Sequence, residues 1–558
     1  MTEKNWYANY DVVVVGSGAG ALVAAIEAGK KGLKTLIVEK GKQWGGSSAL
    51  SGGGIWVPNN PVCKAAGLKD SFEEGMKYFE SCVGDVGPAS SYERRVAFLT
   101  NGPKMVQMML DEGVKFLPGT EYPDYYPELP GGKIGRSFDC YPFDTKLIGE
   151  LGTCISNLGE MPFPMSTGAC HHIPKAFTKP RHLFGVANMV GRGVKLKLKG
   201  QKAVGLGNAL VGNLMYIAKK YNVEVWLGTP CTDILVDDNQ VIGIEVVKDG
   251  KKVFLKTNNI ILGAGGFDHN VEMRQKYHGI GNDWTMGHPN NTGDLHVICE
   301  KLDAEMAIMD DAWWGVGAFD DKNARAFYVW ERSMPHCIIV DQLGQRYLNE
   351  SESYNDFGQH MFQQNEKTGK KAIPSWLIMD TNYLNKYPFG AAMPHMLPKS
   401  FLESGYFIKC NSIEELAKKC CIQKDNLLDT IEHFNGMVDK GEDKGFGRGN
   451  SAYDNYYGDP RYKNPNLGKL EKGPFYAIKI HPTDLGTKGG MLTDEHARVI
   501  KKDGSIIEGL YATGNCSASI MGYKYPGPGA TLGASATFGY IAGNHVAANK
   551  REKKEKVI

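Results

Sequence analysis

The chain has 558 residues, which is enough for several domains of about 100–200 residues each. Hydrophobic residues make up 42% and charged residues 23% of the sequence, and these values exclude a disordered or fibrous chain. The 64 basic and 62 acidic side chains leave a net charge of +2, so the composition provides no overall field for binding nucleic acid. Glycine is the outlier, with 69 residues, or about 12% against roughly 7% in average proteins.

The twelve cysteines are scattered, without CxxC pairs or the spacing of zinc fingers, c-type haem sites or iron–sulfur clusters. The first residues lack the basic, apolar and small-residue regions of a signal peptide, and no run of about 18 apolar residues occurs. Free thiols suit a reducing compartment. We therefore expect a cytoplasmic protein that does not span a membrane.

The first elements expected are a strand, a glycine-rich turn, a helix and a second strand. Residues 10–15 (YDVVVV) and 33–38 (LKTLIV) are apolar runs typical of buried parallel strands. Between them lie Gly16, Ser17, Gly18, Ala19, Gly20, Ala21 and a helical segment, and Glu39 follows the second strand. Such glycines admit a pyrophosphate at the helix N-terminus, and the acid accepts hydrogen bonds from ribose hydroxyls. The pattern predicts a dinucleotide site; the alternative is a turn that needs glycine for packing alone.

A second glycine-rich loop follows Glu39 and Lys40. It contains Gly45, Gly46, Ser47, Ser48, Gly52, Gly53 and Gly54. Backbone and hydroxyl groups here can follow a longer ligand toward its far end, which favours FAD over NAD. Further strands are expected over residues 223–227, 234–247, 259–262 and 507–512, and the last two lead to glycine turns containing Gly265, Gly266, Gly514 and Asn515.

These motifs resemble the FAD-binding domain of the flavoprotein family that contains fumarate reductases, succinate dehydrogenases and 3-ketosteroid dehydrogenases. The resemblance implies that FAD is bound non-covalently, that the loop from Gly45 to Gly54 lies along the flavin, and that the turn at Gly514–Asn515 closes over it. Gly205 and Gly207 follow a lysine-rich stretch rather than an apolar strand, so a separate NAD(P)H domain is not expected.

The expected fold class is α/β, a Rossmann-like FAD-binding domain of the GR2 type with an inserted α+β capping domain. Residues 1–285 and 475–552 are expected to form the FAD-binding domain, and residues 286–474, rich in Tyr and Trp, the catalytic and substrate domain. Residues 147–202 are expected to form an apolar and basic flap within the first domain. Residues 553–558 belong to a basic tail.

The last glycine motif distinguishes the branches of this family. Residues 521–532 read MGYKYPGPGATL and hold no arginine, although fumarate reductases use one there as proton donor. The stretch closely resembles the YPGPG segment of 3-ketosteroid Δ1-dehydrogenases. Residues 51–58, 122–126 (YPDYY), 346–351 (RYLNES) and 484–490 match the same family in order, so the resemblance spans nearly the whole chain.

The resemblance implies a role for four residues. The hydroxyl of Tyr525 and the N–H of Gly529 hold the substrate carbonyl, as an oxyanion hole does for an enolate. Tyr354 is the base that takes the C2 proton, assisted by Tyr125, while FAD takes hydride from C1. Ala530 and Leu532 are expected beside the cofactor. A buried packing role is the alternative for any one of the 26 tyrosines, and Tyr122 and Tyr126 compete with Tyr125.

The flap has two interpretations. Residues 194–199 (VKLKLK) alternate apolar and basic side chains, which predicts an amphipathic strand at the surface. The functional interpretation is a lid that rests on a membrane with its lysines near anionic head groups, favouring sterols with a long side chain such as cholest-4-en-3-one. His171 and His172 suggest a metal, but no third ligand stands at a usual spacing, so no metal site is expected.

The expected function is FAD-dependent 1,2-desaturation of a 3-ketosteroid or sterol, with an artificial or quinone-type electron acceptor, no nucleic acid partner and a peripheral membrane contact. Three alternatives stay open. They are Δ4-(5α) desaturation of a ketosteroid, reduction of an activated alkene as in fumarate reductases, and a flavin module that transfers electrons without substrate chemistry.

Overall fold

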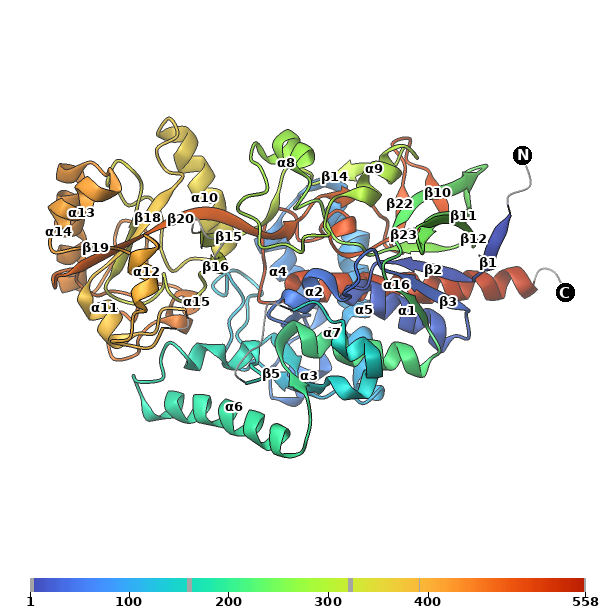
Figure 1. Cartoon of the computed structure of the whole chain (residues 1–558), viewed down its shortest axis with the longest axis horizontal. Helices are drawn as coiled ribbons and strands as arrows, with labels where there is room; N and C mark the ends of the chain where they lie inside the picture. Colours follow the sequence, from blue (N-terminus) through green and yellow to red (C-terminus); the bar gives the residue numbers. More distant parts are fainter. Residues whose placement is uncertain (1–4, 158–162, 320–324, 391, 556–558) are drawn as a thin grey trace.

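The computed structural model describes residues 5–157, 163–319, 325–390 and 392–555. The larger sheet runs in the order β1 (Trp6–Asn9), β12 (Lys251–Lys256), β11 (Gln240–Lys248), β23 (Ile506–Ala512), β13 (Ile260–Leu262), β2 (Val12–Val15), β3 (Thr35–Val38) and β9 (Glu224–Trp226); β10 (Cys231–Asp237) pairs with β11 and β22 (Arg498–Ile500) with β23. Strands from both ends of the chain therefore share one sheet, as Figure 1 shows.

The parallel strands of this sheet end level with one another. Val15 pairs with Val38 and with Leu262, and Leu262 pairs with Ala512. The next residues along the chain are Gly16, Glu39, Gly263 and Thr513, so the predicted glycine turns and the predicted acid meet at one edge. Ligands of open α/β sheets bind at the carboxyl ends of the strands.

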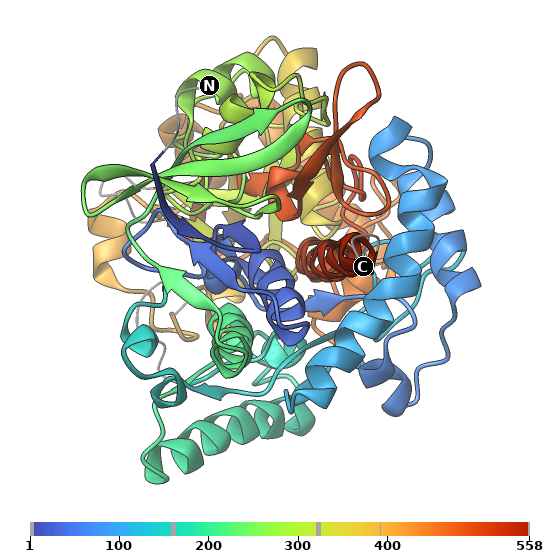
Figure 2. The same cartoon turned by 90° about the vertical axis from the view of Figure 1, so that its right-hand side faces the viewer.

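The apolar run of β2 is buried on both faces of the sheet. Val12 and Val14 belong to one hydrophobic cluster, and Val13 and Val15 belong to another. A strand covered on both faces needs apolar side chains at every position, which explains VVVV. The helices α1 (Ala19–Lys30), α7 (Leu206–Lys220) and α16 (Ala530–Glu555) lie together, because α1 packs against both others. Figure 2 looks along α16 and shows α1 beside it.

The second large sheet runs in the order β16 (Arg325–Phe327), β15 (Ala312–Phe319), β20 (Phe475–Thr487), β18 (Ser375–Met379) and β17 (Cys337–Val340), with β19 (Ile408–Cys410) on β20. Helices α10 (Tyr354–Lys367), α11 (Thr381–Lys386), α12 (Lys399–Glu403), α13 (Ile413–Cys420), α14 (Lys424–Lys440) and α15 (Ala452–Tyr457) surround it. β20 starts at the residue where the sequence places the return to the first domain, and it pairs within the second sheet. The domain division stays a prediction.

The remaining elements are short or lie at the periphery. The strands are β4 (Ile55–Trp56), β5 (Phe116–Pro118), β6 (Ser137–Cys140), β7 (Phe143–Asp144), β8 (Ala203–Val204), β14 (Met306–Ala307) and β21 (Gly490–Met491). The α-helices are α2 (Gly46–Leu50), α3 (Pro61–Ala65), α4 (Phe72–Tyr78), α5 (Tyr92–Asp111), α8 (Val271–His278) and α9 (Asp294–Glu300). Short 3₁₀ and π turns are η1 (Phe79–Val83), η2 (Gly87–Ser90), η3 (Thr145–Thr153), η4 (Thr167–His172) and η5 (Gly514–Cys516). In the described part of the chain, no helix is long and apolar enough to cross a bilayer.

The flap contains a helix where a strand was expected. Residues 194–198 form the end of α6 (Pro180–Leu198) and Lys199 caps it; the helix lies along one border of the molecule in both views. Proline at the first helical position suits a helix start. The buried residues of α6 are spaced by seven and so lie on one face of the helix: His182, Met189 and Leu196. The six-residue alternation was too short to distinguish the two periods. The amphipathic strand is therefore a wrong prediction.

Candidate active site

A cavity of about 480 Å³ opens where the glycine turns meet at the sheet edge. Gly16 has a φ of +100°, and a side chain there would overlap the backbone of Gly263. Gly53, at φ +70°, would likewise meet the backbone of Leu206. Only glycine fits these positions without moving a neighbouring turn, so backbone lines the cavity where the sequence predicts the dinucleotide.

The acid after β3 is held in place beside the first glycine turn. The Ser17 hydroxyl donates to Glu39 Oε2 at 2.5 Å, and the Gly41 N–H donates to Oε1 at 2.8 Å. Burial raises the pKa of the Glu39 carboxyl, and these hydrogen bonds oppose that rise. Glu39 thus presents a fixed acceptor at the cavity wall, as a ribose-binding acid requires.

The N-terminus of α1 faces the same cavity. The helix is preceded by Gly18, has no side-chain cap and has no acidic residue in its first turn. Ser48 Oγ accepts a hydrogen bond from the Ala19 N–H at 3.0 Å. The dipole of α1 favours an anion at this end, and the backbone-lined cradle at Gly16 and Gly18 leaves room for a pyrophosphate. The residues fit a dinucleotide, and the second glycine-rich loop and the turn at Gly514 and Asn515 extend the cavity toward the room that FAD needs.

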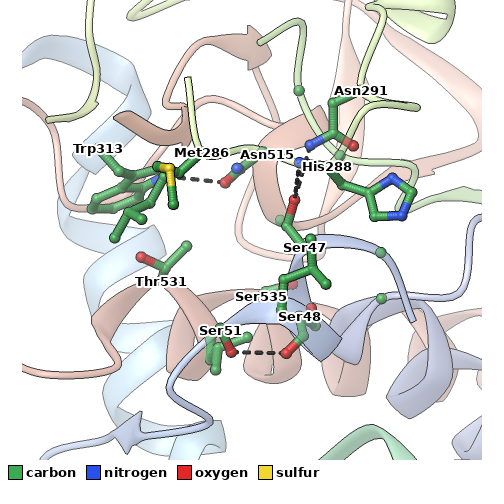
Figure 3. A pocket seen from close by; sticks show the side chains of 18 of the residues that line it. Ser47, Ser48, Ser51, Met286, His288, Asn291, Trp313, Asn515, Thr531 and Ser535 are labelled. Carbon is green, nitrogen blue, oxygen red and sulfur yellow. Dashed lines mark hydrogen bonds between the residues drawn. The ribbon is translucent and has the colours of Figure 1, made fainter. Parts of the chain in front are cut away.

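Polar residues that the sequence did not single out complete the middle of the cavity (Figure 3). The Ser47 hydroxyl accepts hydrogen bonds from Asn291 Nδ2 at 3.0 Å and from the His288 N–H at 3.2 Å. Trp313 Nε1 donates to Asn515 Oδ1 at 3.1 Å. Met286, Thr531 and Ser535 also lie around this part of the cavity. Met286, His288 and Asn291 lie in a segment without a motif, and the only sequence signal for Trp313 was the aromatic richness of its region.

The loop of residues 525–529 (YPGPG) is anchored through its carbonyl groups. Pro526 O accepts from the Tyr125 N–H at 2.9 Å and from Tyr78 Oη at 2.7 Å. Pro528 O accepts from Ser137 Oγ at 2.7 Å, and Gly529 O accepts from the Trp56 N–H at 3.1 Å. The loop leads directly into α16, so the Gly529 N–H lies at the positive end of a long helix.

Three tyrosine rings meet beside this loop. Tyr125 Oη donates to Tyr354 Oη at 2.7 Å. The ring centroid of Tyr525 lies 5.1 Å from that of Tyr125 and 5.4 Å from that of Tyr354. All three residues are buried and line the cavity, together with Gly529. The fold thus brings together the four residues assigned to catalysis by resemblance, from four separate segments.

The two competing tyrosines point elsewhere. Tyr126 Oη donates to Asp356 Oδ1 at 2.9 Å and does not line the cavity. Tyr122 lines it, but its hydroxyl lies 2.9 Å from that of Tyr457. Tyr125 is therefore the member of the YPDYY segment that bonds directly to Tyr354.

Burial dominates the ionisation of this cluster. Removal from water raises the pKa of Tyr354 well above its usual value, the neighbouring tyrosines raise it further, and the hydrogen bond from Tyr125 opposes them. Burial also raises the pKa of Tyr525, and the Thr531 and Tyr354 hydroxyls and the Gly529 N–H oppose that rise. Tyr525 and Gly529 both line the cavity, as paired donors to one oxygen must.

An ion-pair network holds the segment just before α10, which begins at Tyr354. Glu350 accepts from Arg346 at 2.7 Å and lies 3.2 Å from Arg448, and its other oxygen accepts from the Ile339 N–H at 3.1 Å. Arg346 also contacts Asp443 at 2.7 Å. Burial disfavours the ionised Glu350, but the two guanidinium groups outweigh it and hold the pKa of this carboxyl below its usual value. The RYLNES segment is thus a rigid support for the residue that follows it.

Most of the residues predicted for the cofactor line the cavity: Gly16, Ser17, Gly18, Glu39, Lys40, Gly46, Ser47, Ser48, Gly52, Gly53, Gly54, Gly265, Gly266, Gly514, Asn515 and Leu532. Ala19, Gly20, Ala21, Gly45 and Ala530 do not line it. Gly20 instead packs against Ser535 of α16, where a side chain would overlap the backbone. Among the described residues that line the cavity there is no arginine, which a dicarboxylate would call for.

Comparison with known proteins places this geometry in a family. The family described as FAD binding domain matches residues 11–532. A 3-oxosteroid 1-dehydrogenase of Mycolicibacterium smegmatis is 43% identical over 97% of both chains. A crystal structure of 3-ketosteroid Δ1-dehydrogenase from Sterolibacterium denitrificans, in complex with 1,4-androstadiene-3,17-dione, is 35% identical with a TM-score of 0.91, covering 97% of this chain and 100% of that one.

A third relative is similar in fold alone. The structure of a 3-ketosteroid Δ4-(5α)-dehydrogenase from Rhodococcus jostii has a TM-score of 0.69 at 20% identity, covering 98% of both chains. The glycine cradle, the fixed acid and the match over residues 11–532 lead to one conclusion. The chain belongs to the FAD-binding domain family of flavoproteins, and FAD is the cofactor that this membership indicates.

Proposed function

We propose that this protein is an FAD-dependent 3-oxosteroid 1-dehydrogenase, which introduces a 1,2 double bond into a 3-oxo-4-ene steroid. The observation that carries the proposal is the hydrogen-bonded pair Tyr125–Tyr354, 2.7 Å apart, beside Tyr525 and the Gly529 N–H in the same cavity as the glycine cradle. Relatives and a solved structure that share 35–43% of the sequence carry this activity in their names.

The residues divide the reaction into two tasks. The Tyr525 hydroxyl and the Gly529 N–H bind the 3-oxo group and stabilise the negative charge that develops on its oxygen. This charge acidifies the adjacent C2–H, and Tyr354 accepts that proton. Bound FAD supplies the acceptor for the hydride that leaves C1. Apolar groups such as Phe327 and Trp330 line the remaining wall and exclude water.

The raised pKa of Tyr354 means that neighbouring groups must stabilise its phenolate form. Burial favours the protonated phenol, so the phenolate requires stabilisation from within the site. The hydrogen bond donated by Tyr125 becomes stronger when Tyr354 carries a negative charge. Tyr125 is therefore a positioning and stabilising partner of the base.

The product distinguishes this proposal from its alternatives. The purified flavoprotein is incubated with a 3-oxo-4-ene steroid and an artificial dye acceptor, and the steroid is analysed by mass and by ultraviolet spectrum. We expect dye bleaching and a 1,4-dien-3-one. Turnover only of a 5α-reduced 3-oxosteroid, to a 4-ene, would support Δ4 chemistry instead. Consumption of a reduced dye with an activated alkene would support an alkene reductase, and no reaction with any substrate would support an electron-transfer module.

The preference for long side chains is tested in the same assay. We propose that cholest-4-en-3-one is a substrate, and that a quinone-type compound accepts the electrons in place of the dye. A higher kcat/KM for cholest-4-en-3-one than for a steroid without the side chain supports the first point. A lower value contradicts it and leaves the 1,2-desaturation itself unaffected.

We further propose that α6 contacts a membrane surface. Its outward face exposes Leu183, Phe184, Val194 and Leu198, of which Phe184 is 75% and Leu198 is 84% exposed. Lys195, Lys197 and Lys199 are exposed beside them. An amphipathic helix with apolar residues and lysines suits the interface of an anionic bilayer. Such a contact would place the cavity near a reservoir of insoluble sterol.

Vesicle flotation tests the contact. The wild-type protein should float with vesicles of phosphatidylcholine and phosphatidylglycerol, and less with phosphatidylcholine alone. The double variant Phe184→Asp/Leu198→Asp should remain at the bottom with both. Met396 is 69% exposed in a different part of the molecule, so Met396→Asp is the control and should float like wild type. Wild-type protein that stays at the bottom with both vesicle types would refute the contact.

A further inference from the structure

Three histidines meet where the flap joins the wall of the cavity. His171 and His172 end η4, and His182 lies in the first turn of α6. One ring nitrogen from each can be chosen so that all three lie within 4.8 Å of one another. The sequence offered no third ligand at a usual spacing; the fold provides one, because the turn between η4 and α6 brings His182 back over the pair.

His171 already has the arrangement of a metal ligand. Its Nδ1 lies 3.1 Å from the Gly168 carbonyl oxygen and 2.9 Å from Tyr456 Oη. Its Nε2 is buried and makes no hydrogen bond to any residue that the structure describes. Histidines that bind metals commonly anchor one ring nitrogen on a backbone carbonyl and offer the other to the ion. The side chain is 2% exposed, so a ring nitrogen without a hydrogen bond here requires an explanation.

The other two rings approach each other closely. His172 Nδ1 and His182 Nδ1 are 2.9 Å apart, which allows one shared proton in the absence of an ion. Nitrogens bound to a tetrahedral zinc at 2.0–2.1 Å are separated by roughly 3.3 Å. A small rotation of either ring is sufficient to reach that spacing. Arg181 donates to His182 Nε2 at 3.2 Å, and its side chain is 60% exposed, so it can turn to solvent when the ring proton moves to Nε2.

The carboxylate of Glu121 lies beside the histidine cluster. Glu121 Oε2 lies 3.3 Å from His171 Nε2, and Glu121 Oε1 lies 3.9 Å from Arg181 Nη1. The second cation nearby, Lys175, donates a hydrogen bond to the Tyr456 carbonyl oxygen. Glu121 therefore lies within reach of an ion bound at His171 Nε2, and its negative charge balances the neighbouring cations.

We propose that His171, His172 and His182, with Glu121 as fourth ligand, bind a zinc ion that holds α6 against the cavity wall. Zinc is favoured because three imidazoles and one carboxylate suit its tetrahedral preference. With four protein ligands the site is closed to substrate, so its role is structural.

The position gives the ion a direct consequence for the active site. Thr167 and Cys170, in the same turn as the histidines, line the cavity. Tyr456, which contacts His171, stacks on Tyr122 with ring centroids 4.4 Å apart. Zinc would thus fix the wall on which the steroid rests and would tie the flap to it.

The test uses full-length flavoprotein without a polyhistidine tag. It is exposed to Zn²⁺, passed through a desalting column with a weak chelator, and analysed for zinc and flavin by mass spectrometry and absorbance. We expect about one tightly bound zinc per chain in wild type. The variants His182→Ala and His172→Asn should keep their flavin and lose the zinc. His433→Ala, which removes an exposed histidine of α14, should retain both.

A second readout detects the structural role. Hydrogen exchange of residues 167–199 should be slower with Zn²⁺ than with chelator in wild type, and it should not respond to Zn²⁺ in His182→Ala. Equal zinc content in wild type and in both histidine variants would overturn the proposal. So would exchange in wild type that is unchanged by zinc, whatever the steroid activity of the protein.

Discussion

Gly529 is the residue on which the geometry of the carbonyl site depends most strictly. Its φ of +96° is unfavourable for other residues, and a side chain would overlap the carbonyl group of Gly54 in the loop that lines the flavin site. The same close approach allows the Trp56 N–H to bind Gly529 O at 3.1 Å. A single backbone position therefore joins the predicted flavin loop to the predicted oxyanion donor.

Gly529→Ala should lower kcat/KM by about 10²-fold or more, because the N–H donor must move when the loop shifts. Gly67→Ala is the matched control: Gly67 has φ +98° on the surface with no atom near the added methyl group. The control carries the same backbone strain of about 1–2 kcal/mol without a clash. Steady-state kinetics on both variants makes the comparison, and equal activities would show that Gly529 does not set the donor position.

At this scale the sequence predicted the residue types more readily than their contacts. Tyr354, Tyr525 and Gly529 lie in motifs that identify them, and all three meet in the structure. The choice among Tyr122, Tyr125 and Tyr126 depended on side-chain direction, which a run of adjacent tyrosines does not reveal. His182 and Asn291 could not be found at all, because their neighbours come from other segments and no spacing rule links them.

At the scale of elements, the support beneath α10 determines whether Tyr354 is correctly placed. Glu350 is fully buried between Arg346 and Arg448 and also accepts from the Ile339 N–H. Losing one member of such a network leaves buried charges without a partner, which is strongly destabilising. The network therefore affects both stability and the position of the base.

Glu350→Ala should lower the free energy of unfolding by about 3–5 kcal/mol and should reduce activity, because the first turn of α10 loses its anchor. Glu366→Ala, on the exposed end of the same helix, is the control and should resemble wild type in both respects. Denaturant unfolding followed by flavin fluorescence measures the stability. Full activity and unchanged unfolding of Glu350→Ala would show that the network does not position Tyr354.

Elements were predictable where one period dominates a long segment. The VVVV strand, the glycine turn and α1 follow the expected order, because burial on both faces and a phosphate-binding turn impose an unambiguous pattern. The prediction for the end of α6 was wrong, because six residues of alternating lysine and apolar side chains fit a strand and the exposed end of a helix equally well.

At the scale of the whole molecule, segments from both ends of the chain build one cavity. Gly16 and Glu39 come from the first forty residues, Asn515 and Gly529 from the last fifty, and Tyr354 from the segment between them. The resemblance predicted this convergence. β20 pairs within the second sheet, although its residues follow the predicted return to the FAD-binding domain at residue 475. The sequence pattern did not reveal this pairing.

The free energy of unfolding should decrease as the pH rises through a range set by the buried acid Glu331. Burial raises the pKa of Glu331 to about 7, above the value of about 4.3 for an unfolded chain. The folded protein then holds a proton that the unfolded chain loses, so the cost of Glu331 grows from about pH 4 and is complete above pH 7. Glu331→Gln should therefore gain Tm relative to wild type as the pH rises from 5 to 8.

Thermal unfolding of Glu331→Gln, wild type and the exposed control Glu366→Gln at each pH measures this difference. The control should follow wild type throughout. A Tm difference between Glu331→Gln and wild type that stays constant from pH 5 to 8 would contradict the buried, protonated state of Glu331.

The most direct test of the proposed function is anaerobic reduction of the bound flavin by a 3-oxo-4-ene steroid, followed by its absorbance in a stopped-flow instrument. Tyr453→Phe is the matched control, because Tyr453 packs on Tyr125 while its buried hydroxyl has no hydrogen-bond partner among the residues described. Wild type and Tyr453→Phe should bleach at similar rates, and Tyr354→Phe should retain its flavin and bleach about 10²–10⁴-fold more slowly. Bleaching of Tyr354→Phe at the wild-type rate, or a wild-type flavin that no ketosteroid bleaches, would contradict the account.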